Sequence, residues 1–467
     1  MLRIFRHYFS TAALCLFVCE AAMVGFVLYA ASVSLQMPGP GVVESAPSAL
    51  ETVIIPALIV SIGMYALGLY KPQQLENLRR TLPRLVAVLC IFAPILIVTS
   101  DITWINPELD ARGRALVYLR WTIVLFSCVL LARLGYWAVI RMAVRPHRAV
   151  VVGVGRLAAE LEELTAQRSG SGTEIVGYVP LSQEAARIPA GRIRSSSGSL
   201  LALARDAAAS EIVVALDDRR GVPLTPLLEA RAEGIRITNY LSFWERETRR
   251  VNLEALDPSW LIYSDGYRLG TTVNAILKRA LDVGVSLALL ILALPTILLT
   301  ALAIKLDSRG PILYRQERVG RDGATFDIYK FRTMQADAEK SGVPQWAAVR
   351  DPRITAIGSV LRMTRIDELP QLLNVLRGEM SFVGPRPERP FFVENLSREI
   401  PFYSERHRVR PGITGWAQIN YPYGASIKDA RAKLSYDLYY IKNYSFLFDL
   451  LIILSTAHAV LVNKGGR

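Results

Sequence analysis

The chain has 467 residues, of which 52% are hydrophobic and 20% are charged, and its formal net charge is +13. So apolar a composition excludes an ordinary soluble enzyme of this length and favours a membrane component. The excess of Lys and Arg suits anionic lipid head groups or phosphorylated substrates, and nucleic acid is not expected as a partner because no basic run is interleaved with aromatic residues.

Four apolar stretches in the first third predict a bundle of four transmembrane helices over residues 1–145. The stretches run Thr11–Val33, Thr52–Tyr70, Leu85–Thr99 and Ala115–Ile140. Each approaches the ~20 residues that a helix needs to cross a bilayer. Arg120 and Arg133 lie inside the fourth stretch and are candidates for its true ends. Basic residues follow the second and fourth stretches, so the positive-inside rule predicts that everything after the fourth helix faces the cytoplasm.

Residues 146–265 alternate short apolar strands with amphipathic helices, which predicts a Rossmann-like α/β domain. Its first turn, Gly153-x-Gly155-x-x-Ala158, is typical of a dinucleotide-binding site. The acidic residue expected after the second strand is missing, because that strand ends Gly177-Tyr178-Val179-Pro180. A structural or regulatory domain is therefore favoured, and a cofactor-binding domain remains the alternative.

A second kind of apolar segment, Val283–Ile304, is long enough to span a bilayer but contains Pro295 in its middle. Lys278 and Arg279 precede this run, and Lys305 and Arg309 follow it. Basic residues on both flanks oppose a crossing. We expect a helix-break-helix hairpin over residues 278–306 that enters and leaves the same leaflet, with a plain fifth crossing as the alternative.

The chain ends with a further apolar segment, Phe446–Val462, which is interrupted by Asp449 and three other polar residues. Lys442 precedes it and Lys464 follows it. We interpret residues 446–463 as an interfacial helix that lies on the cytoplasmic leaflet.

Residues 311 to 437 are dense in groups that handle phosphate. The Arg side chain forms a fork that matches phosphate oxygens, and Lys acts as a point charge. The turn Val383-Gly384-Pro385-Arg386-Pro387 is stiff, so it lowers the entropy cost of aiming Arg386. A solvated basic surface is the alternative for any single Arg. No Gly-x-x-x-x-Gly-Lys-[Ser/Thr] motif occurs, which argues against a P-loop NTPase.

Two adjacent acids, Asp367 and Glu368, stand at the start of a predicted helix that Pro370 opens and Gly378 closes. Ordinary capping of the helix by acids is one interpretation. The other is catalytic: one carboxylate attacks phosphorus, and the other holds Mg²⁺ that bridges a diphosphate. Further on, the Gly-rich turn around Trp416 either contacts a base or sugar hydroxyls or is simply a packed loop.

At these motifs residues 274–467 closely resemble the bacterial sugar transferases, which are polyprenyl-phosphate hexose-1-phosphate transferases. The matching segments are Lys278-Arg279-x-x-Asp282, the Pro-broken hairpin, Gly310-Pro311, Arg315-Gln316-Glu317-Arg318-Val319-Gly320, Lys330-Phe331-Arg332-Thr333-Met334, Asp367-Glu368-Leu369-Pro370-Gln371-Leu372 with Asn374, Val383-Gly384-Pro385-Arg386-Pro387 and Arg410-Pro411-Gly412-Ile413-Thr414-Gly415-Trp416. Such an ordered series is a highly specific signal. One departure is Leu294, which stands where the family often has Ser before the breaking Pro.

The resemblance implies a monotopic phosphoglycosyl transferase that serves exopolysaccharide synthesis, some members being linked to exosortase systems. Asp367 would attack the β-phosphorus of a UDP-sugar, release UMP and carry the phosphosugar, which polyprenyl (undecaprenyl) phosphate would then accept. Glu368 would bind Mg²⁺, and Lys330, Arg332 and Arg386 would neutralise phosphate charge. From the resemblance, the hexose is expected to be glucose or galactose.

The resemblance also implies the layout of the long form of the family. That layout is a membrane α-helical bundle, a Rossmann-like α/β domain, and a mainly helical α/β catalytic domain at residues 274–467 with a re-entrant hairpin. Lys278, Arg279, Asp282 and Pro295 would belong to the hairpin, which would position polyprenyl phosphate among inner-leaflet lipids. The expected location is the bacterial inner (cytoplasmic) membrane with the catalytic domain facing the cytoplasm, and a homodimer is left open.

Two rival functions follow from other parts of the chain. A membrane-anchored oxidoreductase or epimerase would need an intact nucleotide site at Gly153–Ala158, and the missing acidic ligand disfavours it. A catalytically silent scaffold for polysaccharide export would have no need of both Asp367 and Glu368.

Overall fold

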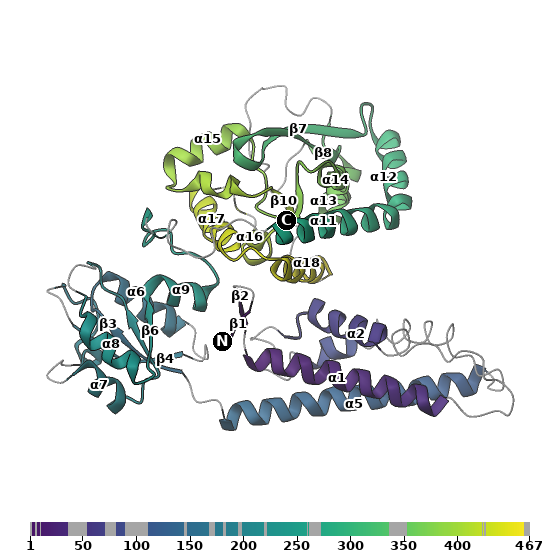
Figure 1. Cartoon of the computed structure of the whole chain (residues 1–467). Helices are drawn as coiled ribbons and strands as arrows, with labels where there is room; N and C mark the ends of the chain where they lie inside the picture. The colour runs from purple at the N-terminus through teal and green to yellow at the C-terminus, as the bar shows by residue number, and fades with distance from the viewer. Residues whose placement is uncertain are drawn as a thin grey trace. The chain divides into compact units, whose positions relative to one another are not determined.

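The computed structural model describes residues 2–4, 7–9, 11–35, 54–70, 81–88, 111–143, 147–167, 173–180, 184–194, 199–218, 222–258, 260, 272–335, 353–422, 424 and 426–461. The chain divides into two compact units: the first is Met1–Ala143 with Leu447–Gly466, and the second is Val144–Phe446. Figure 1 colours the chain from purple at the N-terminus to yellow at the C-terminus.

The first unit holds long apolar helices. After a short antiparallel pair of strands, β1 (Leu2–Ile4) and β2 (His7–Phe9), come α1 (Thr11–Leu35), α2 (Ile55–Ala66) and α5 (Ala111–Ala143). Among the described residues, α1 and α5 contain segments long and apolar enough to cross a membrane, Ala13–Ala30 and Leu119–Val139. The helix α2 is shorter, and most of the predicted third stretch, residues 85–99, lies outside the described residues. The complete four-helix bundle therefore stays a prediction.

A buried ion pair joins α1 to α5 inside the first unit. The Nε of Arg133 lies 2.7 Å from Oε1 of Glu20, and the two side chains are 3% and 0% exposed. The hydroxyl of Tyr70 donates to the other Glu20 oxygen at 2.5 Å. Arg120 and Arg133 both lie within α5, so their interpretation as helix ends is wrong. Glu20 supplies the counter-charge that a guanidinium needs in such a place.

The second unit begins with a four-stranded parallel sheet of order β4-β3-β5-β6, as the alternation in the sequence predicts (Figure 1). Its elements are β3 (His147–Val152), α6 (Arg156–Gln167), β4 (Thr173–Val179), α7 (Leu200–Asp206), β5 (Glu211–Val214), α8 (Leu224–Ala232), β6 (Arg236–Asn239) and α9 (Tyr240–Thr248). Strand β3 buries Val151 in the core on one face and Val150 in the core on the other. We call residues 147–260 the parallel-sheet domain.

The rest of the second unit, residues 272–446, is the C-terminal domain. Its elements are α11 (Thr272–Leu292), α12 (Leu294–Asp307), β7 (Leu313–Val319), β8 (Thr325–Phe331), α13 (Ala356–Thr364), α14 (Gln371–Arg377), β9 (Ser381–Val383), α15 (Pro390–Glu399), β10 (Gly412–Thr414), α16 (Trp416–Asn420) and α17 (Ile427–Lys442). Strands β7 and β8 form an antiparallel hairpin, and β9 pairs with β10 in parallel. A last helix, α18 (Phe446–Leu461), matches the predicted helix at the end of the chain.

The helices α11 and α12 form the helix-break-helix that the sequence predicts. They are bent by 61° relative to each other at Ala293. Pro295 lies in the first turn of α12, where its missing N–H costs nothing and its ring prevents α11 from continuing. Leu292, Leu299 and Leu306 are 77%, 68% and 78% exposed. A surface of leucines this exposed is not suited to water.

The parallel-sheet domain and the C-terminal domain are joined by buried polar contacts. The Nζ of Lys442, at the end of α17, lies 2.8 Å from a carboxylate oxygen of Glu245 in α9, and both side chains are less than 10% exposed. The indole N–H of Trp416 donates to the carbonyl of Arg249 at 2.9 Å. Trp416 also stacks on Tyr439. These contacts favour the packed-loop interpretation of the turn around Trp416.

Candidate active site

The two adjacent acids lie in a short turn between α13 and α14 rather than in a helix. Arg365 ends α13 in the left-handed region with φ of 61°, and Ile366–Glu368 then form a single 3₁₀ turn. Pro370 precedes α14 directly, and Gly378 ends α14 with φ of 85°, as the sequence predicts. A positive φ at a non-glycine residue is strained, so the surrounding contacts must hold Arg365 in place. The result is a sharp corner that carries Asp367 and Glu368 together.

Glu368 lies at the centre of three basic side chains. Its Oε1 accepts a hydrogen bond from Arg386 at 2.7 Å and one from Lys330 at 3.2 Å. Arg365 lies 3.8 Å from the same oxygen. Burial by itself would raise the pKa of Glu368, but Arg386 and Lys330 outweigh it and hold the pKa well below the usual range. Glu368 therefore stays ionised and holds these basic side chains around its carboxylate.

Asp367 has the opposite environment. Its side chain is buried, with the residue 8% exposed, and its Oδ1 has no hydrogen-bond partner among the described residues. Burial raises the pKa of Asp367, and the neighbouring charge of Glu368 raises it further. Two adjacent carboxylates whose pKa values are pushed apart are suited to different roles. A carboxylate with an unsolvated, unpaired oxygen is a better nucleophile than one that is fully hydrogen-bonded.

The cations come from separate parts of the C-terminal domain. Lys330 lies on β8, where burial lowers the pKa of its ammonium group and Glu368 opposes that change. Arg386 lies in the turn after β9. The structure thus brings together four of the residues that the resemblance singled out, namely Asp367, Glu368, Lys330 and Arg386. Arg365 joins them, and sequence reasoning missed it because its position depends on the left-handed corner.

Arg332 is not brought to this cluster. Its guanidinium donates to the carbonyls of Ser308 and Arg309 at 2.7 and 2.9 Å, just beyond the end of α12. Strand β8 ends at Phe331, so the alternation that would place residues 330 and 332 on one face no longer applies. The residue is 6% exposed. In this position Arg332 ties the end of α12 to the β-hairpin.

The charged residues of α11 hold the predicted membrane hairpin against α14 and β9. Arg279 donates to the carbonyls of Val375 and Leu376, at the end of α14, at 2.6 and 2.7 Å. Lys278 donates to the carbonyl of Val383 at 3.1 Å. Asp282 accepts a hydrogen bond from the backbone N–H of Phe382 at 2.9 Å. The hairpin is therefore held by α14 and β9, the two elements that follow the acids.

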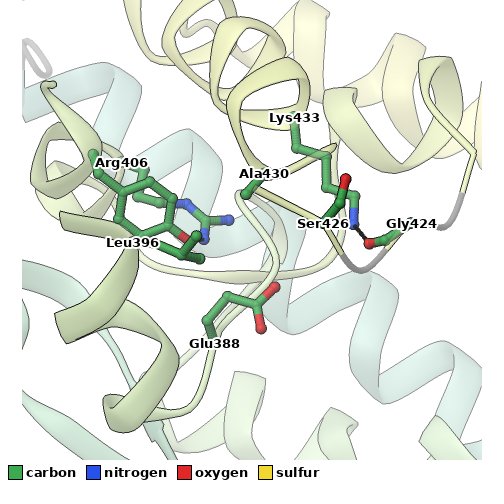
Figure 2. Close-up of a pocket in the computed structure, with 8 residues that line it drawn as sticks. Glu388, Leu396, Arg406, Gly424, Ser426, Ala430 and Lys433 are labelled. Atoms are coloured by element: carbon green, nitrogen blue, oxygen red, sulfur yellow. Dashed lines mark hydrogen bonds between the residues drawn. The ribbon is translucent and has the colours of Figure 1, made fainter. Parts of the chain in front are cut away.

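A small hollow lies beside the Arg386 turn. Glu388, Arg406 and Lys433 contribute its charged walls, and Lys433 donates to the carbonyl of Gly424 at 2.7 Å (Figure 2). Neither Asp367 nor Glu368 lines it. The hollow is therefore not the place where the two acids meet a substrate.

The glycine turn of the parallel-sheet domain is filled by the chain's own carboxylates. Asp217 accepts hydrogen bonds from the N–H groups of Arg156 and Leu157, at the start of α6, at 2.7 and 2.9 Å. Glu184 accepts one from the N–H of Asp217 at 2.7 Å. A Cβ at Gly155 would lie 2.3 Å from Asp217 Oδ2, so this glycine makes room for the carboxylate. The N–H groups that would bind a pyrophosphate already have an acceptor.

The donors near the acidic pair suit Mg²⁺ better than a metal that needs an all-protein cage. Among the described residues, no group of three or more His, Cys, Asp or Glu could hold a metal ion. Mg²⁺ is usually held by one or two carboxylates together with substrate phosphates and water. Glu368, which the 3₁₀ turn places beside Asp367, offers one carboxylate and so meets that smaller requirement.

Comparison with known proteins points to one family. The family model for bacterial sugar transferase matches residues 273–463. The chain is 45% identical over 223 residues to UDP-N-acetylgalactosamine-undecaprenyl-phosphate N-acetylgalactosaminephosphotransferase of Aeromonas hydrophila, which covers 48% of this chain and 52% of that protein. It is 43% identical over 196 residues to UDP-glucose:undecaprenyl-phosphate glucose-1-phosphate transferase of Escherichia coli (strain K12), covering 42% of each chain.

A third relative is matched over its whole length. Exopolysaccharide production protein PSS of Rhizobium leguminosarum bv. phaseoli is 44% identical over 203 residues, which is 42% of this chain and 100% of that protein. The match thus spans about half or less of the first two relatives and all of the third. The residues that the family model matches, 273–463, include the acidic corner.

Proposed function

Since the chain belongs to the bacterial sugar transferase family, we propose that it transfers a hexose-1-phosphate from a UDP-sugar to undecaprenyl phosphate. The products would be undecaprenyl-diphospho-sugar and UMP. The observation that carries this proposal is the divided environment of two adjacent carboxylates: Glu368 gathers Lys330 and Arg386, whereas Asp367 keeps an unpaired oxygen. That arrangement suits covalent catalysis at a diphosphate.

The first step would be attack by Oδ1 of Asp367 on the β-phosphorus of the UDP-sugar. A bond forms between this oxygen and phosphorus, the bond from phosphorus to the bridging oxygen breaks, and UMP leaves with the electron pair. Lys330 and Arg386 would neutralise the charge that develops on the phosphoryl oxygens. Because burial raises the pKa of Asp367, its carboxylate is more basic than an exposed one, which favours bond formation.

The second step would return the phosphosugar to a lipid acceptor. A phosphate oxygen of undecaprenyl phosphate attacks the same phosphorus, and Asp367 leaves as a carboxylate. Glu368 stays ionised throughout, because its pKa is held low, so it keeps Lys330 and Arg386 in place for both steps. Mg²⁺, when bound by Glu368 together with the substrate, would supply further neutralisation of the diphosphate.

The bent helices α11 and α12 would bring the lipid acceptor to the acidic corner. We propose that they enter and leave the cytoplasmic leaflet, since their exposed leucines suit lipid and their basic flanks suit anionic head groups. Arg279 and Lys278 bind the elements next to the acids, so the hairpin would hold a lipid phosphate close to Asp367. The C-terminal domain would then lie on the cytoplasmic face of the bacterial inner membrane and serve exopolysaccharide synthesis.

A screen of UDP-sugars tests the proposal directly. Membranes that contain the full chain would be incubated with undecaprenyl phosphate, Mg²⁺ and each of UDP-glucose, UDP-galactose and UDP-N-acetylgalactosamine. UMP release and the labelled lipid product are measured together. One sugar should yield both in equal amounts, and EDTA should stop both. Hydrolysis of a UDP-sugar without any lipid product, or no UMP with any sugar, would contradict the proposal.

A further inference from the structure

A second layer of charge lies behind the Arg386 turn. Arg406, in the 3₁₀ segment Tyr403–Arg408, is 6% exposed, and Asp437, on α17, is 2% exposed. The Arg406 Nη2 lies 2.9 Å from Oδ2 of Asp437. The Nη1 of Arg406 donates to the hydroxyl of Tyr403 at 2.8 Å. Within the described part of the chain, neither Arg406 nor Asp437 forms a hydrogen bond or ion pair with Asp367 or Glu368.

The link from this buried pair to the acids runs through Arg386. The Nη2 of Arg406 also donates to the main-chain carbonyl of Arg386 at 2.9 Å. The side chain of Arg386 then reaches Glu368 at 2.7 Å. One residue thus receives a hydrogen bond on its backbone from Arg406 and gives one with its guanidinium to Glu368. The hydrogen bond from Arg406 therefore fixes the position of the Arg386 backbone, from which the side chain extends to Glu368.

Stability alone does not explain a buried ion pair in this position. Removing two charges from water carries a large desolvation penalty, and packed apolar residues of similar volume often stabilise a fold as well or better. The side chain of Arg406 is also on the wall of the hollow in Figure 2, where it faces Glu388. A planar fork makes several directed bonds that a point charge cannot make. The ion pair between Arg406 and Asp437 is therefore suited to fixing the position of the turn that carries Arg386.

We propose that Arg406 and Asp437 are positioning residues that hold the Arg386 turn so that its guanidinium stays aimed at the reacting phosphate. This inference rests on the proposed function. Arg406 acts only through Arg386, and Asp437 acts by fixing the orientation of Arg406. Errors of about 1 Å in the placing of a catalytic group can cost on the order of 100-fold in rate. Loss of the contact should therefore lower kcat more than it raises KM for the UDP-sugar.

The test is a double-mutant cycle on Arg406→Lys and Arg386→Ala. Arg406→Lys keeps the charge that Asp437 needs but loses the fork, so kcat should fall by about tenfold or more while KM for undecaprenyl phosphate stays unchanged. In the Arg386→Ala background, Arg406→Lys should cost almost nothing further, because the residue it positions has gone. Additive losses in the cycle would overturn the inference, as would a kcat equal to that of the wild type. Arg408→Lys, an exposed arginine in the same segment, is the matched control and should leave kcat unchanged.

A labelling experiment separates this inference from the proposed function, because it needs no activity. Phenylglyoxal modifies exposed arginines, and peptide mass spectrometry gives the extent at Arg386. Arg406→Lys and Asp437→Asn should both raise labelling of Arg386 at least threefold, and Arg408→Lys should not. Equal labelling in all forms would show that the pair does not hold Arg386, even if UMP is released. If labelling of Arg386 rises in these variants but the wild-type chain releases no UMP, the positioning role would hold and only the proposed function would be contradicted.

Discussion

Carboxylates occupy two turns of this molecule in opposite ways. In the parallel-sheet domain, Asp217 accepts hydrogen bonds from two backbone N–H groups at the start of α6, and Glu184 closes the turn behind it. In the C-terminal domain, Glu368 gathers Lys330 and Arg386, and Asp367 keeps an unpaired oxygen. The first turn resembles a phosphate site but is already filled by a tethered anion. The second turn does not have the sequence of a phosphate-binding loop, but its two cations and the unpaired oxygen of Asp367 can interact with a substrate.

The difference lies in what the acids are paired with. Backbone N–H groups that already donate to an acceptor cannot donate to a ligand as well. A carboxylate on the same chain is present at a high effective concentration, so it outcompetes a free anion for these groups. Lysine and arginine side chains carry full charge and several donors, so they can bind Glu368 and a phosphate together. A glycine pattern therefore says less about phosphate binding than the charges around it.

Asp367→Asn should have the largest effect. The asparagine is similar in size but cannot form the bond to phosphorus, so UMP release should fall on the order of 10⁴-fold or more. Burial raises the pKa of Asp367, so the charged form is disfavoured there, and removing the charge should leave the Tm unchanged or slightly higher. UMP release and thermal unfolding in detergent would be measured on the same preparation.

Asp322→Asn is the matched control for this substitution. Asp322 is 63% exposed and lies in the left-handed region, which asparagine tolerates. It should keep full activity and stability. Activity of Asp367→Asn within tenfold of the wild type would remove the nucleophile from the proposal.

Glu368→Gln should damage both activity and stability, which distinguishes it from its neighbour. Lys330 and Arg386, which are 18% and 31% exposed, lose their counter-charge, and weakening these charge-assisted hydrogen bonds should cost about 2 kcal/mol. Because Lys330 is buried, its pKa should fall further without Glu368, and the group should lose its charge. We expect kcat to fall on the order of 100-fold and the Tm to fall as well. A Tm that matches that of Asp367→Asn would mean that Glu368 does not organise the cations.

Arg332→Met tests the assignment of a basic residue that the structure places away from the acids. It loses charged hydrogen bonds to the carbonyls of Ser308 and Arg309, each worth about 2 kcal/mol, so the Tm should fall and the end of α12 should be cut faster by trypsin at Arg309. The KM for the UDP-sugar should change less than threefold. Lys330→Met is the contrast and should lower kcat far more. A raised KM in Arg332→Met with an unchanged Tm would return Arg332 to the phosphate-binding group.

These cases show which features a single sequence reveals. The break at Pro295 and the end of α14 at Gly378 were predictable because each follows from the conformational limits of one residue. The parallel strands were predictable from short-range alternation. The pairing of Arg406 with Asp437, and of Glu20 with Arg133, joins segments far apart in the chain, and no local rule reports it.

The acidic corner stands between these extremes. The adjacent acids and the basic residues were visible as a pattern, and the resemblance to a family grouped them. Which basic residues reach Glu368 depended on where β8 ends and on the strained backbone of Arg365, and the sequence gives no direct sign of either. This is why the structure has Lys330 beside the acids and Arg332 at the end of α12.

Asp217→Asn should have the smallest effect and bears directly on the filled turn. The amide oxygen can still accept one N–H bond, but the charge at the positive start of α6 is lost, so the free energy of unfolding should fall by about 1 kcal/mol. The kcat for UMP release should not change, because the turn takes no part in the reaction. Thermal unfolding and UMP release, measured in parallel, would show whether both expectations hold.

The same turn predicts that the wild-type chain does not bind a nicotinamide nucleotide. NADH and NADPH should show no enhancement or shift of fluorescence when titrated with the full chain, since Asp217 occupies the N–H groups that a pyrophosphate would need. Asp217→Asn should behave identically, because Gly155 is packed against this side chain and not against open space. Saturable NADH binding to the wild type would mean that Asp217 swings away, and the contrast between the filled and the open turn would then fail.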